Sequence, residues 1–96
     1  MNFETILKKY VDVRNDLIYN HDGDIGFRIH EAVSRYQELV LAATSLTFGE
    51  LAEFAWKNKG YHDVLIKVYH DIERSPELKL QQQIYQKIRR YEEVSE

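Results

Sequence analysis

Oxygen-bearing side chains at regular spacing in residues 20–31 form the most specific chemical pattern in the sequence. Asn20, Asp22 and Asp24 stand at alternate positions, and Glu31 follows seven residues after Asp24. Carboxylate and amide oxygens are the ligands that Ca²⁺ prefers, and one glutamate can chelate with both of its oxygens. The pattern makes Asn20, Asp22, Asp24 and Glu31 candidate calcium ligands.

The same twelve residues resemble the calcium loop of the EF-hand family. Their oxygen ligands fall at loop positions 1, 3, 5 and 12, and helices are predicted on both sides. Two residues depart from the family pattern. Ile25 stands where the loop needs a glycine with positive φ, and Asn20 replaces the usual first aspartate. The resemblance implies calcium binding that orders the two flanking helices; the alternative is a plain turn in which Asp24 caps the second helix.

The sequence contains no other pattern that indicates catalysis. It has no cysteine, no glycine-rich phosphate loop and no nucleophile elbow. We therefore expect a protein that is not an enzyme and that needs no cofactor.

Five segments repeat their apolar residues with the period of an α-helix, and none alternates with the period of a strand. The predicted helices cover 3–19, 25–44, 48–58, 61–74 and 76–92. The connections between them are short, which favours antiparallel neighbours. The sequence thus predicts an all-α fold, a compact antiparallel bundle of four to five short helices, in one domain over residues 1–96.

Capping signals and apolar stripes define the later helices. Thr47 and Glu50 have the spacing of a capping box, and the third helix is expected to end at Lys59-Gly60, where glycine can take a left-handed conformation. Ser75-Pro76 begins the last helix. Its expected core residues are Leu80, Ile84, Ile88 and Tyr91.

Two large apolar residues lie off the stripes of their helices. Trp56 is about 140° around its helix from the core residue Leu51, and Ile66 stands among charged residues. Their helices are adjacent in the chain, so the two side chains could share one surface. An exposed tryptophan beside an isoleucine is typical of interaction hot spots.

Charge and hydropathy argue against two classes of partner. The net charge is −3 with both signs mixed along the chain, so no basic face indicates nucleic acid. A weaker alternative is nucleic-acid binding through the last helix, which carries Lys79, Lys87, Arg89 and Arg90. The longest apolar run is far too short to cross a membrane. We expect a soluble, cytoplasmic protein.

The leading functional hypothesis is a small non-catalytic regulator that binds another protein, as inhibitors, immunity proteins and antitoxins do. The expected binding surface comprises Trp56, Ile66, His62, Lys67 and His70. A second copy of the chain is an alternative partner for that surface, because an apolar patch can be covered by its own copy.

Overall fold

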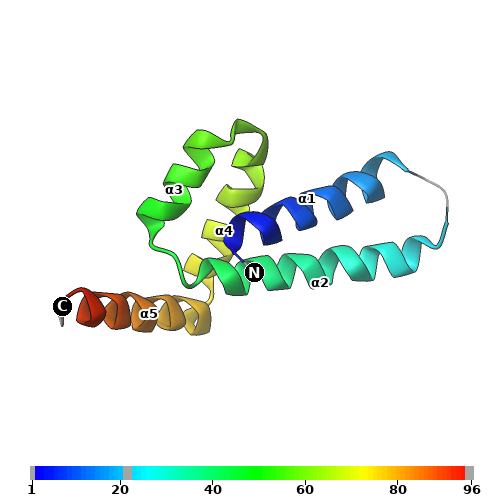
Figure 1. Cartoon of the computed structure of the whole chain (residues 1–96). Coiled ribbons are helices and arrows are strands. Elements are labelled where there is room, and N and C mark those ends of the chain that lie inside the picture. The colour runs from blue at the N-terminus through cyan, green and yellow to red at the C-terminus, as the bar shows by residue number, and fades with distance from the viewer. Residues whose placement is uncertain (1, 21–22, 95–96) are drawn as a thin grey trace. The chain divides into compact units, whose positions relative to one another are not determined.

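The computed structural model describes residues 2–20 and 23–94, with the side chains of 59, 89 and 91–94 outside the described part. Every regular element in these ranges is helical. In chain order they are α1 (Phe3–Tyr19), α2 (Ile25–Ala43), α3 (Phe48–Lys57), the short 3-10 helix η1 (Lys59–Tyr61), α4 (His62–Arg74) and α5 (Pro76–Val94), as Figure 1 shows. The predicted all-α class with five helices is confirmed, and every predicted boundary lies within two residues of the observed one.

Side-chain caps fix where the helices begin. The Asn2 side chain accepts a hydrogen bond from the Thr5 amide at 2.9 Å and starts α1. Before α3, Thr47 Oγ1 accepts from the Glu50 amide at 3.1 Å, and Glu50 Oε1 accepts from the Thr47 amide at 3.2 Å. The predicted capping box is therefore present, and it satisfies two amides that the first turn would otherwise leave unpaired.

The end of α3 differs from the expectation. The helix stops at Lys57, and Asn58 closes it because both its backbone amide and its side-chain amide donate to the Phe54 carbonyl, at 3.0 and 3.2 Å. Among the described residues only Gly23 has a positive φ, of 91°. Gly60 therefore does not take the left-handed conformation, and η1 carries the chain directly into α4.

Contacts divide the chain into two compact units, residues 1–42 and 43–96. The prediction of a single domain stays a prediction. In the first unit, α1 and α2 form an antiparallel helical hairpin (Figure 1). The rings of Tyr10 and Tyr36 meet across this hairpin with centroids 5.3 Å apart. Leu7 and Leu39 are its largest fully buried side chains.

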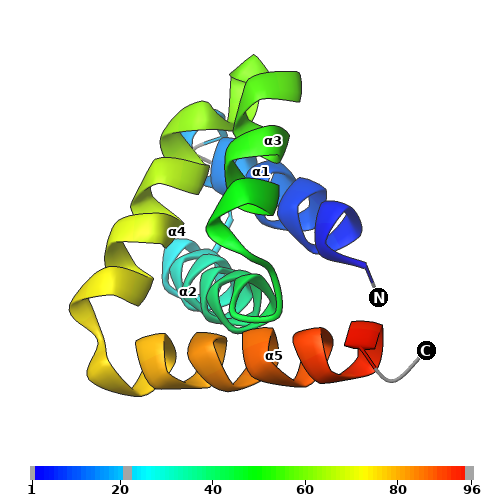
Figure 2. The same ribbon diagram turned by 90° about the vertical axis from the view of Figure 1, so that its left-hand side faces the viewer.

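In the second unit, α3 and α4 lie side by side and antiparallel, and α5 runs across the direction of α4 (Figure 2). Of the apolar residues that recur at helical spacing on α4, Val64, Leu65, Val68 and Ile72 are buried, whereas Tyr69 is 38% exposed. The Ser75 hydroxyl accepts from the Leu78 amide at 3.3 Å and so caps α5, as predicted.

The core face of α5 was predicted wrongly. Leu80, Ile84 and Ile88 are exposed, whereas Gln82, on the opposite side of the helix, is only 1% exposed. The Gln82 side-chain amide donates to the Leu46 carbonyl at 3.0 Å. This hydrogen bond lies on the inward side of α5, and the aliphatic side faces outward. The side chain of Tyr91, the fourth predicted core residue, lies outside the described part.

No helix in the described part of the chain is both long enough and apolar enough to cross a membrane.

Candidate protein-binding groove

The second unit carries an apolar groove of about 720 Å³ between α3 and α4. We name it the Trp56 groove. Its lining residues share an apolar or aromatic character and come from two facing helices: Phe48, Leu51, Ala52, Ala55, Trp56, His62, Leu65, Ile66 and Tyr69. Leu51 and Leu65 are buried, and the small side chains of Ala52 and Ala55 leave the space that forms the groove.

The antiparallel packing of α3 and α4 defines the two ends of the Trp56 groove. At one end, the rings of Phe48 and Tyr69 meet edge to face with centroids 4.8 Å apart. At the other end lie Trp56 and His62, from the last turn of α3 and the first turn of α4. The eight-residue step from Phe48 to Trp56 corresponds to about 12 Å of helix.

Trp56 is the most exposed large apolar residue of the described chain, with 82% of its surface accessible. Ile66 is 43% exposed on the facing helix. Both therefore lie off the core, as their position off the helical stripes indicated, and the groove brings them together. A tryptophan left this exposed gains contact area at little cost in conformational freedom when a partner covers it.

Of the other three residues predicted for the binding surface, one lines the groove and two lie outside its lining. His62 lines the Trp56 groove, whereas Lys67 and His70 are exposed on α4 outside its lining. The His70 ring stands edge-on to Tyr69 with centroids 5.6 Å apart, so it adjoins the Phe48–Tyr69 end.

An ion pair lies beside Trp56 on α3. Lys57 Nζ is 2.8 Å from Glu53 Oε1, one helical turn away. The hydrogen bond and the negative charge of Glu53 raise the pKa of Lys57. Lys57 is therefore charged throughout the neutral range, and the tryptophan end of the groove carries one charge of each sign.

Six lining residues were not expected in the binding surface: Phe48, Leu51, Ala52, Ala55, Leu65 and Tyr69. Tyr69 lies on α4 and is 38% exposed. The spacing of Phe48, Ala52 and Ala55, at steps of four and three residues, places them on one face of α3. That spacing was the signal in the sequence for a groove, because small alanine side chains on the same helix face as a phenylalanine leave a depression beside its ring.

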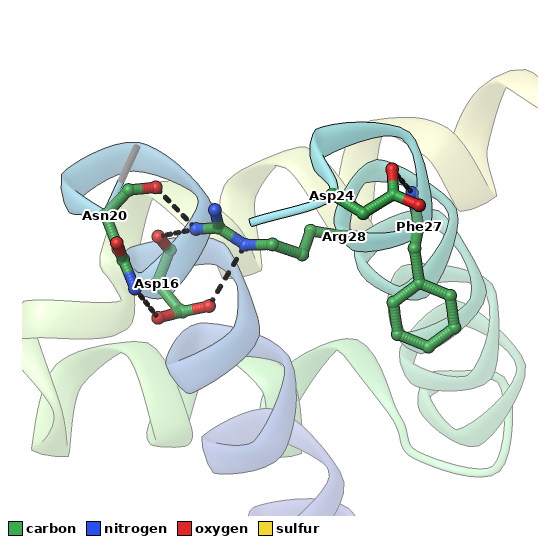
Figure 3. Close-up of polar contacts among 5 residues, drawn as sticks. All are labelled: Asp16, Asn20, Asp24, Phe27 and Arg28. Carbon is green, nitrogen blue, oxygen red and sulfur yellow. Dashed lines mark hydrogen bonds and ion pairs between the residues drawn. The ribbon is translucent and has the colours of Figure 1, made fainter. Parts of the chain in front are cut away.

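Arg28, near the start of α2, contacts the end of α1 (Figure 3). Arg28 Nη2 donates to the carbonyl oxygens of Asp16 and Asn20, the latter at 2.6 Å, and Arg28 Nε lies 3.3 Å from Asp16 Oδ2. The Asp16 carbonyl also accepts from the Asn20 amide at 3.0 Å, and the carbonyls at the end of a helix carry the negative end of its dipole. The cation held by these oxygens is thus the guanidinium of the chain itself.

The candidate calcium ligands are dispersed between the end of α1 and α2. Asn20 donates its side-chain amide to Asp16 Oδ1 at 3.3 Å, and Asp24 Oδ1 accepts from the Phe27 amide at 3.2 Å, which caps α2 as the plain-turn alternative expects. Glu31 lies within α2, and Asp22 lies outside the described residues. Calcium binding stays a prediction, which calorimetric titration with millimolar Ca²⁺ tests.

Among the side chains that the structure describes, no three His, Asp or Glu gather closely enough to hold a metal ion. On α5, the basic residue Lys79 pairs with Glu73, with Nζ 3.1 Å from Oε2.

The chain matches no protein-family model, and comparisons with curated proteins and with solved structures found no match.

Proposed function

We propose that this chain is a non-catalytic regulator that binds another protein through the Trp56 groove. The observation that carries the proposal is the 82% exposure of Trp56 at the edge of an apolar groove. Hot spots of protein interfaces are enriched in tryptophan that is buried against apolar neighbours on binding. We also propose a cytoplasmic partner, because a sequence without cysteine suits a reducing compartment.

The shape of the Trp56 groove favours an amphipathic helix as the bound segment. Its walls are two antiparallel helices, and its length of about 12 Å matches about two turns of a third helix. A helix in such a groove inserts apolar residues spaced by three, four and seven positions. Ala52 and Ala55 allow these side chains to approach closely, and Trp56 and Ile66 can cover them from either side.

The test begins with affinity capture from the host lysate, followed by purification of any stoichiometric partner. Trp56→Ala should weaken binding by at least about 30-fold, which corresponds to a hot-spot contribution of about 2 kcal/mol. The matched control is Leu41→Ala on α2, which truncates another exposed apolar residue outside the groove and should leave affinity unchanged. The partner's own activity is then measured with and without the bound chain.

A partner whose affinity is the same for wild type and Trp56→Ala would show that the groove is not the binding surface. A partner that binds through the groove and keeps its activity unchanged would refute the regulatory role. If the chain associates with itself and Trp56→Ala abolishes this association, the partner of the groove is a second copy of the chain.

A further inference from the structure

α5 turns an apolar stripe away from the unit to which it belongs. Leu80, Ile84 and Ile88 follow one another at steps of four residues and are each about half exposed. The opposite side of the helix is held inward by the buried Gln82. A helix normally buries its apolar side against its own domain, so a stripe facing outward indicates a surface that another molecule covers.

We propose that this stripe, Leu80, Ile84 and Ile88, pairs with the same stripe of a second copy, antiparallel, about a twofold axis through Ile84. An isologous interface requires a surface that complements itself. Leu80 and Ile88 lie at equal distances on either side of Ile84, so the rotation places Leu80 against Ile88 of the other copy. The inference is independent of the Trp56 groove and of what binds there.

Charge favours the antiparallel arrangement over the parallel one. Among the described side chains that border the stripe, Glu77 precedes Leu80 and Lys87 adjoins Ile88. With Ile84 at the axis, Glu77 of one copy and Lys87 of the other are separated by about 6 Å along the helix, within reach of both side chains. A parallel pair would instead place Glu77 of one copy beside Glu77 of the other, so that like charges meet.

The available area fits a weak dimer. Leu80, Ile84 and Ile88 are each about half exposed, so the stripe offers a small contact surface. Small interfaces are typical of weak association. We therefore expect dimers that dissociate at micromolar concentration.

Sedimentation of the full chain between about 1 and about 300 µM tests the pairing. Ile84→Glu places two carboxylates at the axis and should weaken dimerisation at least about 100-fold. Ile66→Glu is the matched control, because it makes the same change at a residue of similar exposure, 43% against 49%, in the Trp56 groove. It should leave the dimer intact, and circular dichroism confirms that both variants fold.

Single cysteines test the geometry, since the natural chain has none. A disulfide requires Cα atoms within about 7 Å. Ile84→Cys should cross-link two copies on oxidation, whereas Leu80→Cys should not, because antiparallel pairing separates the two cysteines by about 12 Å along the axis.

Three results would overturn the inference. The first is a protein that stays monomeric at every concentration. A monomer in which the thiol of Ile84→Cys resists alkylation would show that another part of the same chain covers the stripe. The second is equal loss of dimer in Ile84→Glu and Ile66→Glu. The third is cross-linking of Leu80→Cys as efficient as that of Ile84→Cys, which would indicate a parallel pair.

Discussion

Replacing Arg28 by Met should destabilise the hairpin of α1 and α2 by about 2 kcal/mol. The substitution keeps most of the apolar stem and removes the guanidinium that contacts the carbonyls of Asp16 and Asn20 and the carboxylate of Asp16. A hydrogen bond to a charged group contributes about 1.5–3 kcal/mol. The Asp16 side chain is exposed, so its ion pair adds less than about 1 kcal/mol. The Arg28 side chain is only 13% exposed, whereas the residues whose carbonyls it contacts are exposed, so we expect a loss in the lower part of this range.

Urea unfolding followed by circular dichroism measures this change, and thermal unfolding should show a decrease in Tm of about 8–16 °C. Lys8→Met is the control, because it removes an exposed ion pair with Glu4, at 3.3 Å, from the same hairpin. That pair should contribute no more than about 0.5 kcal/mol. If Arg28→Met and Lys8→Met differ by less than about 0.5 kcal/mol, Arg28 does not hold the turn and the reasoning fails.

Three further predictions concern the second unit. Thr47→Ala should cost about 1 kcal/mol of unfolding free energy, because it removes half of the capping box; an unchanged urea midpoint would contradict this. Gln82→Met should cost about 1–3 kcal/mol by leaving the Leu46 carbonyl without its donor, whereas Gln83→Met, at an exposed site, should change little. Glu53 raises the pKa of Lys57 above the usual lysine value of 10.5, so an NMR titration should show Lys57 losing its proton at higher pH than in Glu53→Gln. The small stabilisation from this pair is present below the pKa of unfolded lysine and disappears as pH rises through the folded value.

Local signals in the sequence were sufficient to predict the helices and most of their ends. Thr47, Glu50 and Ser75 are strong caps, and each makes the expected hydrogen bond. The end of α3 was harder to predict. Asn58 and Gly60 both favour a helix terminus, and the hydrogen bonds that Asn58 makes to Phe54 decide between them. Where two neighbouring residues both favour a helix end, the backbone geometry decides which of them ends the helix, and residue types alone do not specify that geometry.

Two residues of the Trp56 groove followed from helical angles. The rotation of about 100° per residue placed Trp56 and Ile66 off their stripes, and both are exposed. The depression between them could not be derived in the same way. It depends on Ala52 and Ala55 facing α4 across an antiparallel pair, and therefore on the rotation of two helices about their axes. The Arg28 contacts were missed because they join residues eight and twelve apart in the sequence, on two different helices.

The orientation of α5 shows why periodicity alone is insufficient. A helical stripe shows that Leu80, Ile84 and Ile88 share one side, but it does not say which side the rest of the protein covers. α5 also contains three consecutive glutamines at 81–83, and these give it a second side that can pack. A glutamine amide can satisfy an unpaired carbonyl in a loop, which an aliphatic side chain cannot do, and a buried carbonyl without a donor costs about 1–3 kcal/mol. In α5 the Leu46 carbonyl accepts this hydrogen bond from Gln82 in a partly buried contact, on the glutamine side of the helix. The aliphatic side is exposed, and it is therefore the side that we propose for a second copy.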